Sequence, residues 1–192
     1  IGIRFCVSLC CFMKEQIQRY IDQHHLLSGK NPVIVGISGG ADSVALLHML
    51  VSLGYNCIAA HCNFNLRDAE SVRDEQFTTD FAHHLQVPLH KISFNTIKYS
   101  QDNRLSVEMA ARELRYRWFE ELLQTYKAEA IAVAHHRDDS VETLLINLTR
   151  GSGLAGLTGI KPKNGNVVRP LLSISREDIF SYIGENGLEY VT

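Results

Sequence analysis

A short run of glycines, hydroxyl groups and one carboxylate is the part of the sequence best suited to binding phosphate. The run reads Ser38-Gly39-Gly40-Ala41-Asp42-Ser43 and lies between the apolar stretches 33–37 and 44–47. These stretches predict a buried strand that turns directly into a helix. Glycines take positive φ angles and let the backbone approach a ligand, and the N–H groups at the start of a helix attract anions. We therefore expect Gly39 and Gly40 to shape a phosphate-binding turn, with hydroxyl donors from Ser38 and Ser43.

The carboxylate of Asp42 is unexpected in such a turn, because a phosphate beside it would be repelled. Asp42 can cap the helix, or it can hold a divalent cation between itself and the phosphate. A plain strand-turn-helix with two glycines and an aspartate cap is also compatible with the motif. The run lacks the Gly-Lys-Ser/Thr of P-loop nucleoside triphosphatases and the GxGxxG of dinucleotide-binding folds. The sequence therefore predicts a phosphate site outside both of those classes.

Length and composition indicate one reduced, cytoplasmic domain. The chain has 192 residues, of which 45% are hydrophobic, and a formal net charge of −2. This charge excludes a uniformly basic nucleic-acid binder but leaves room for a local basic patch. No apolar run approaches the roughly 18 residues that a membrane span needs, and the five cysteines form no CxxC pair. We expect one catalytic domain over 13–192, preceded by an N-terminal extension of 1–12, and no membrane contact.

Strands and helices are expected to alternate from residue 33 onward. The pattern is typical of an α/β protein with a doubly wound, mainly parallel five-stranded sheet and helices on both faces. The expected strands are 33–37, 57–61, 88–94, 130–134 and a short extended piece at 167–168. The expected helices are one from Met13 to about Ser28 and others at 43–53, 70–86, 107–127, 140–149 and 176–186, with a polar connection at 99–105.

Polar clusters follow three of these strands. The phosphate-binding turn follows the first strand, His61 to Arg67 follow the second, and His135 to Asp139 follow the fourth. Ligands of such sheets bind outside the carboxyl ends of the strands, where the strand order reverses. We therefore expect the three clusters to meet at one edge of the sheet and to form one site.

Several segments resemble the PP-loop superfamily of ATP pyrophosphatases, which split ATP between its α and β phosphates. The turn at 38–43 is similar to the PP-loop itself, and the chain from about residue 33 to its end is similar to one branch, the tRNA(Ile)-lysidine synthetases. The matching motifs are a segment of the H-x-N-H-x-L-R type at 61–67 with Glu70-Ser71, E-x-x-A-R-x-x-R-Y at 108–116, A-H-H-x-x-D-x-x-E-T at 134–143, R-G-x-G-x-x-G-L-x-G at 150–159 and R-P-L at 169–171. In the first of these motifs, Phe64 stands where the family has its second histidine.

The resemblance implies an enzyme that uses ATP and Mg²⁺ to join free lysine to the wobble cytidine of tRNA(Ile). The cytosine C2 oxygen attacks the α-phosphate, pyrophosphate leaves, and the lysine ε-amine then displaces AMP. The resemblance also implies that the turn at 38–43 holds pyrophosphate and that Asp42 holds Mg²⁺. Arg112 would stabilise the charge of adenylation, and Asp139 would position the lysine amine with His135 or His136. The remaining candidates are His61 and Asn63 for the nucleotide, and Arg67, Arg115, Arg150, Lys161 and Arg169 for tRNA or substrate.

Purely structural roles for several of these residues stay open at this point. His61 and Asn63 can close a strand and cap a turn. Arg112 and Arg115 lie on nearly the same face of a helix, where arginines commonly pair with glutamates, and Arg115 can instead support packing. The basic residues between 150 and 169 can be ordinary surface, or they can form a strip that binds tRNA phosphates.

The carboxylates after the fourth strand also allow more than one role. Asp139 with Glu142 fits a capping box, although Asp139 falls on the aspartate of the family motif and is the favoured functional residue. Asp138 is then a cap or an accessory residue. A zinc site at this cluster lacks a third and a fourth ligand at suitable spacing.

Two other functions compete with lysidine formation. One is a different PP-loop ligase, either a tRNA thiolase or an amidating synthetase, although the paired CxxC motifs usual in such thiolases are absent. The other is a nucleotide-binding domain without turnover. The resemblance further implies that tRNA-binding domains of the family lie beyond this chain, so we expect it to bind ATP yet modify tRNA poorly. A homodimer is an arrangement that the sequence leaves open.

Overall fold

A six-stranded sheet forms the centre of the protein, and its strand order is β3-β2-β1-β4-β6-β5. The computed structural model describes residues 9–66, 68–149 and 159–192. Neighbouring strands are parallel except for β5 and β6, which form an antiparallel pair at one edge. The strands are β1 Val33–Gly36, β2 Cys57–Asn63, β3 Leu89–Ser93, β4 Ala130–Ala132, β5 Lys163–Asn164 and β6 Val167–Val168.

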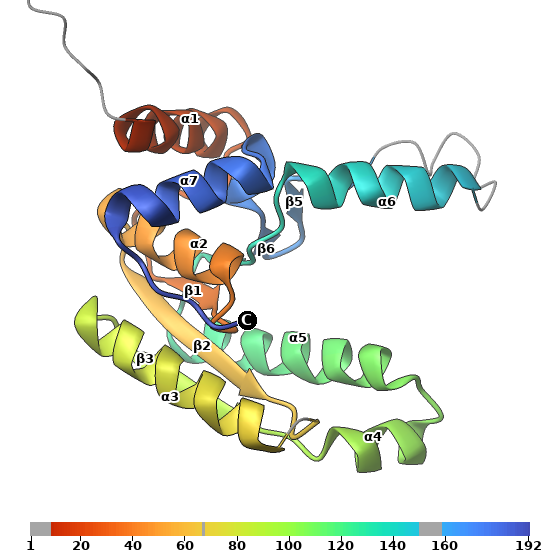
Figure 1. Cartoon of the computed structure of the whole chain (residues 1–192). Coiled ribbons are helices and arrows are strands. Elements are labelled where there is room, and N and C mark those ends of the chain that lie inside the picture. The colour runs from red at the N-terminus through yellow and green to blue at the C-terminus, as the bar shows by residue number, and fades with distance from the viewer. Residues whose placement is uncertain (1–8, 67, 150–158) are drawn as a thin grey trace, which may run out of the picture.

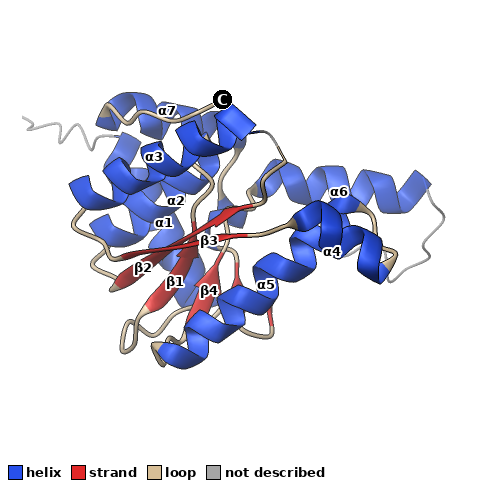
Figure 2. Ribbon diagram, turned by 90° about the horizontal axis from the view of Figure 1, so that it is seen from below, coloured by secondary structure: helices blue, strands red, loops and turns tan. Residues whose placement is uncertain are grey.

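Helices cover both faces of this sheet (Figures 1 and 2). Because side chains alternate along a strand, Val33 and Val35 of β1 face a core shared with α1, α2, α3 and α7, whereas Ile34 faces a smaller core built mainly on α5. The helices are α1 Leu9–Gln23, α2 Ala41–Ser52, α3 Asp68–His84, α4 Thr96–Asn103, α5 Val107–Thr125, α6 Arg137–Thr149, the 3₁₀ helix η2 Pro170–Ser173, and α7 Arg176–Asn186.

The strand order reverses between β1 and β4. From β1 the chain passes through α2 to β2 and then through α3 to β3, after which α4 and α5 return it to the other side of β1. β1 and β4 are paired in register, with Val35 opposite Ala132. The turn after β1 and the polar cluster after β4 must therefore emerge side by side.

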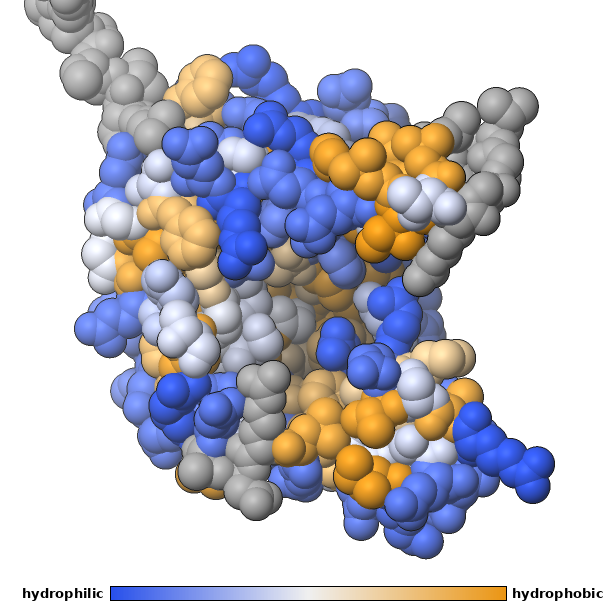
Figure 3. Space-filling view, turned by 45° about the vertical axis from the view of Figure 1, so that its right-hand side comes forward, coloured by the Kyte–Doolittle hydropathy of each residue, from blue (hydrophilic) through white to orange (hydrophobic). Residues whose placement is uncertain are grey.

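Helix α6 differs from the helices that cover the sheet, because it extends away from the body of the protein (Figure 1). None of its residues from Arg137 to Thr149 is buried. Figure 3 shows a hollow on this side of the surface with apolar residues of α6 near its upper edge. The exposed apolar side chains of α6 are Val141, Leu145, Ile146 and Leu148.

The fold class expected from the sequence is confirmed, with three differences in detail. A sixth strand, β5, pairs with β6 because Gly165 takes a φ of 58° in the tight turn between them. The expected polar connection at 99–105 is wrong, because most of this segment belongs to helix α4. The helix begins after Asn95, whose side chain caps it by accepting a hydrogen bond from the Lys98 N–H. Helix α1 begins at Leu9, inside the expected extension, and ends at Gln23 rather than near Ser28.

No helix of the described residues is long and apolar enough to cross a membrane. The longest described helix, α5, carries charged residues along its whole length and buries only one stripe of side chains. Helix α5 is therefore an amphipathic cover for one face of the sheet.

Shortening a core side chain of the central strands should destabilise the protein strongly. Ile131 of β4 is fully buried against α5, so Ile131→Ala is expected to lower the free energy of unfolding by about 2–5 kcal/mol. The matched control is Ile97→Ala in α4, because Ile97 is 46% exposed and its loss should change stability by less than about 1 kcal/mol. Urea unfolding of both variants tests this, and equal losses would contradict the assigned core.

Candidate active site

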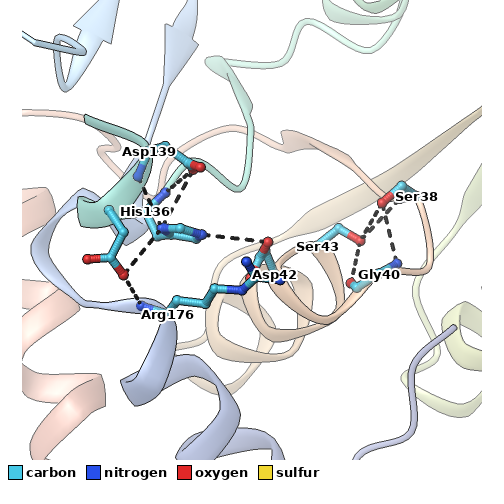
Figure 4. A network of polar contacts seen from close by, with 8 residues as sticks. Ser38, Gly40, Asp42, Ser43, His136, Asp139 and Arg176 are labelled. Atoms are coloured by element: carbon cyan, nitrogen blue, oxygen red, sulfur yellow. Dashed lines mark hydrogen bonds and ion pairs between the residues drawn. The ribbon is translucent and has the colours of Figure 1, made fainter. Parts of the chain in front are cut away.

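The turn after β1 is held in shape by the hydroxyl of Ser43. This oxygen accepts a hydrogen bond from the Ser38 N–H at 3.1 Å, lies 3.1 Å from the Ser38 hydroxyl, and donates to the Gly40 carbonyl at 2.9 Å (Figure 4). Gly39 takes a φ of 95°, but Gly40 has a φ of −69° and is the N-cap of α2. Of the two glycines, therefore, only Gly39 takes a positive φ.

The first N–H groups of α2 are available for an anion. Gly40 carries no side chain that could cap the helix, and the first turn of any α-helix leaves its N–H groups without partners inside the helix. Ser38, Gly40 and Ser43 line one cavity of about 350 Å³. The turn can thus present backbone and hydroxyl donors to the same bound anion.

Asp42 points into this cavity with one oxygen that nothing in the described part of the chain satisfies. Its Oδ1 atom is buried and accepts no hydrogen bond, and its Oδ2 atom lies 3.8 Å from Nε2 of His136. Burial raises the pKa of Asp42 above its ordinary value of 3.8, whereas the nearby His136 and Arg176 lower it. Asp42 is not the N-cap of α2, and its unsatisfied oxygen beside the turn is a ligand of the kind that divalent cations prefer.

The residues present fit Mg²⁺ bound together with a phosphate. Mg²⁺ in nucleotide sites is commonly held by one or two carboxylates, the substrate phosphates and water, and Asp42 offers one unsatisfied carboxylate oxygen beside an anion-binding turn. Within the ranges that the structure describes, no group of three or more His, Cys, Asp or Glu side chains is placed to hold a metal ion by itself.

The cluster after β4 forms the start of α6 and faces the turn (Figure 4). Asp139 Oδ2 accepts a hydrogen bond from the His136 N–H at 2.9 Å, and the Asp139 N–H points back to Nδ1 of His136 at 3.4 Å. This reciprocal pair caps α6 in the way of a capping box, with His136 in place of serine. The capping partner of Asp139 is therefore His136 and not Glu142, which corrects that part of our expectation.

Asp138 links this cluster to the next helix. Its Oδ2 atom accepts a hydrogen bond from the N–H of Arg176 at 2.7 Å, in the first turn of α7, and the side chain of Arg176 extends toward Asp42 (Figure 4). The cap expected of Asp138 is thus present, but it caps α7. Arg176 was not found from the sequence, because no motif there marks it.

His135 lines the cavity, and its surroundings favour the neutral imidazole. Burial lowers its pKa, the positive charges of Arg169, Arg112 and Arg115 lower it further, and the charge of Asp139 acts in the opposite direction. Its Nδ1 atom is buried and has no hydrogen-bond partner in the described ranges. A neutral imidazole on the cavity wall can accept a proton from a bound substrate.

A second cavity of about 490 Å³ adjoins the first. The two share Ser38, Cys62, Phe64 and Arg115 in their walls. The guanidinium of Arg115 lies 5.2 Å above the ring of Phe64, which itself stacks on Phe94. Phe64 stands where the family motif has histidine, and its ring makes a cation–π contact with Arg115. This contact holds the Arg115 side chain in the wall that the two cavities share.

Comparison with known proteins assigns this architecture. A family described as the PP-loop domain matches residues 13–192. The chain belongs to the PP-loop family. It is 58% identical over 179 residues to a tRNA(Ile)-lysidine synthase of Parabacteroides distasonis, a match that covers 93% of this chain and 41% of that protein. It is also 38% identical over 185 residues to a tRNA(Ile)-lysidine synthase of Bacillus subtilis, covering 93% of this chain and 39% of that protein.

The chain spans about two fifths of the length of these curated relatives. Among solved structures, it superposes on a U34-tRNA thiolase, NcsA, from Methanococcus maripaludis with a TM-score of 0.74 at 17% identity, covering 95% of this chain and 66% of that one. It superposes on an NMN synthetase from Francisella tularensis with a TM-score of 0.66 at 15% identity, covering 94% and 71%. At such identities the likeness concerns the PP-loop fold alone.

His61 and Asn63 lie beside the PP-loop, and each makes hydrogen bonds within the protein. The buried His61 ring shares a hydrogen bond of 3.0 Å with the carbonyl of Ile37. Asn63 donates to Glu75 at 3.3 Å and accepts from the N–H of Asn65 at 2.9 Å. Both residues line the second cavity, so they close the strand and shape the cavity wall at once.

The two arginines of α5 are placed differently from our expectation. Arg115 lines both cavities, whereas Arg112 is exposed, lies 4.9 Å above the ring of Tyr116 and lines a separate hollow. The charge of Arg112 still lowers the pKa of His135. Arg115 therefore reaches the PP-loop cavity directly, together with Tyr116 and Phe119 of the same helix, and Arg112 influences the cavity through its charge.

The basic strip expected after residue 150 is not a continuous surface. Arg169 is buried, with Nη1 donating to the carbonyl of Lys161 at 2.9 Å, so it is not an exposed phosphate ligand. Lys161 is exposed, and Lys163 lines a hollow with Glu129. Arg67 and Arg150 lie outside the described residues. Periodicity could not reveal that Arg169 is buried, because that follows from its place between β6 and η2.

Removing the charge of Asp42 should stabilise the folded protein at neutral pH. Burial raises the pKa of Asp42 in the folded state, so the folded state binds more protons than the unfolded state, and stability falls as pH rises above the ordinary value of 3.8. Asp42→Asn should therefore melt at a higher temperature than the parent protein at pH 7.

The difference should shrink as the pH approaches 4, where the parent carboxyl also becomes protonated. Thermal unfolding at both pH values measures it, with Asp80→Asn on the exposed face of α3 as the control. A lower melting temperature of Asp42→Asn at pH 7 would contradict the assigned burial.

Proposed function

We propose that this chain is the ATP-dependent catalytic domain of a tRNA(Ile)-lysidine synthase. The proposed reaction joins free lysine to C2 of the wobble cytidine in an isoleucine tRNA with a CAU anticodon and releases pyrophosphate and AMP. The observation that carries the proposal is the identity of 58% to a protein of that name over 93% of this chain. We place the reaction in the cytoplasm, where uncharged tRNA and free lysine are both present.

The PP-loop supplies the part of the site that would receive the triphosphate. Its hydroxyls and the first N–H groups of α2 face the cavity, and such donors stabilise the charge of a departing pyrophosphate. Asp42 is the residue that would hold Mg²⁺, which when bound offsets negative charge on the phosphates. Arg115 adds a fixed positive charge in the wall of the same cavity.

His135 is the residue that we assign to proton transfer from the lysine amine. It lines the cavity and its imidazole stays neutral, whereas Nδ1 of His136 is engaged by the N–H of Asp139. A lysine ammonium has no lone pair, so it must lose a proton before it can attack carbon. Asp139, whose negative charge acts on the His135 imidazole, is the carboxylate that would hold the ammonium until then.

The wobble cytidine would enter from the second cavity. Recognition of single-stranded loops normally unstacks a base and places it in a protein pocket. The second cavity adjoins the PP-loop cavity through Phe64 and Arg115, and its far wall carries Glu70, Ser71 and Asp74. This arrangement supports a path along which a base reaches the α-phosphate without passing His135 and Asp139, the residues that we assign to the lysine amine.

Loss of the Asp42 carboxylate should abolish the first half of the reaction. The full-length protein is incubated with ATP, Mg²⁺, labelled lysine and tRNA(Ile) with a CAU anticodon, and pyrophosphate release and label transfer are measured. Asp42→Ala is expected to lower both by at least about 100-fold, because it removes the Mg²⁺ ligand beside the phosphates. Asp80→Ala, an exposed change on α3, should leave both unchanged. Label transfer that survives in Asp42→Ala would remove this residue from the mechanism.

Asp139→Asn separates the charge of Asp139 from its capping role. The asparagine carbonyl can still accept the hydrogen bond from the His136 N–H, so the melting temperature should stay within about 2 °C. If the charge holds the lysine ammonium, label transfer should fall at least about tenfold and the KM for lysine should rise, while pyrophosphate release changes little. An unchanged KM for lysine would leave Asp139 with a structural role alone.

A further inference from the structure

The segment that follows α7 runs back to the PP-loop. Helix α7 ends at Asn186 and is capped by Gly187, which takes a φ of 60°. The chain then passes α2 and reaches the end of β1 (Figure 1). There the N–H of Val191 donates a hydrogen bond of 3.0 Å to the carbonyl of Gly39. Residues more than 150 positions apart are thus bonded through their backbones.

This bond acts on the peptide group whose other end faces the cavity. In a trans peptide the C=O and the N–H point in opposite directions within one plane. The carbonyl of Gly39 is held by Val191, so the N–H of Gly40 in the same peptide must point the other way, toward the Ser38 hydroxyl at 3.4 Å and the cavity that Gly40 lines. The bond from Val191 therefore aims a phosphate donor of the PP-loop.

A peptide between two glycines needs such an outside restraint. Glycine adopts positive and negative φ angles about equally well, so the Gly39–Gly40 peptide could rotate with little steric resistance from its own side chains. The side chain of Val191 adds a second restraint, because a Cβ atom on Gly39 would lie 2.6 Å from its Cγ2 atom and 3.4 Å from Phe77. The loop is enclosed by Val191 on one side and by α3 on the other.

Helix α3 also fixes the segment itself. Nη2 of Arg73 donates a hydrogen bond of 2.9 Å to the carbonyl of Thr192. Leu188 packs against the core between the helices. The segment is thus anchored before and after Val191.

We propose that Val191 is a positioning residue of the PP-loop, whose backbone N–H holds the Gly39–Gly40 peptide in the orientation that binds phosphate. The inference rests on the proposed function in one respect, that the PP-loop receives the phosphates of ATP. It adds a segment that no motif of the loop includes. It also means that displacement of the chain after α7 weakens nucleotide binding without any change in the loop sequence.

The test removes the N–H donor and uses a second variant to control for the loss of the Val191 side chain. Val191→Pro has no backbone N–H, whereas Val191→Ala keeps it and loses only the side-chain contact. Dissociation constants for pyrophosphate and for Mg²⁺ with the nonhydrolysable analogue α,β-methylene-ATP are measured by calorimetry. Val191→Pro should bind both about tenfold more weakly, as for the loss of one charge-assisted hydrogen bond, and Val191→Ala should stay within about twofold of the parent protein.

The outcomes separate this inference from the proposed function. If the parent protein binds neither ligand, the proposed function fails and this inference fails with it. If the parent protein binds both and Val191→Pro binds them equally well, only the role of Val191 is overturned. Equal weakening in Val191→Pro and Val191→Ala would also overturn it, because the donor would then not be the cause.

A second measurement covers the case in which Val191→Pro does not fold. In the parent protein, the amide of Val191 should be protected from hydrogen exchange, and pyrophosphate should increase that protection, because binding and the hydrogen bond favour the same peptide orientation. Arg73→Ala should lower the protection and weaken pyrophosphate binding about threefold. An amide of Val191 that exchanges freely, or one that pyrophosphate leaves unaffected, would overturn the proposal.

Discussion

The pairing of β1 with β4 is the constraint on which the site depends. The chain leaves the ends of these neighbouring strands toward different helices, α2 after β1 and α6 after β4. The start of α2 and the start of α6 therefore lie side by side. The first N–H groups of α2 have no side-chain cap and can attract an anion, whereas the N–H groups of His136 and Asp139 are used in the cap of α6. This adjacency brings the PP-loop and the cluster from His135 to Asp139 together in one site.

Charges in the site are balanced in a way that favours a bound cation and a neutral base. Burial works against the ionised form of Asp42 and also against the charged form of His135. The charges of nearby arginines also disfavour the protonated form of His135, while His136 and Arg176 support the charge of Asp42. The same low polarity that disfavours the Asp42 carboxylate strengthens its attraction to a metal ion. The buried Asp42 carboxylate is thus unfavourable in the free protein, and a bound cation would compensate its charge. Asp139 is held rigidly at the edge of the site because it caps α6 through His136, and rigid placement of charged groups lowers the reorganisation that a reaction requires.

The sequence by itself determined the fold class, the PP-loop and the edge of the sheet where the site lies. Glycines after a buried strand and apolar runs of strand and helix period are local signals, and parallel sheets bring the carboxyl ends of their strands together. The run 38–43 and the cluster 135–139 were found in this way. The proposal that Asp42 meets a cation also starts from the sequence, since a carboxylate in a phosphate site would otherwise repel the ligand.

Only the tertiary structure decided which side chains reach the site and which parts of the chain support it. Arg112 and Arg115 are three residues apart on one helix, and only the packing of α5 on the sheet turns Arg115 into the cavity and leaves Arg112 exposed. Arg169 is basic and follows a short strand, yet the fold buries it. Arg176 and Val191 carry no motif and reach the PP-loop from the end of the chain. These outcomes depend on contacts between distant segments, and local sequence patterns carry no information about such contacts.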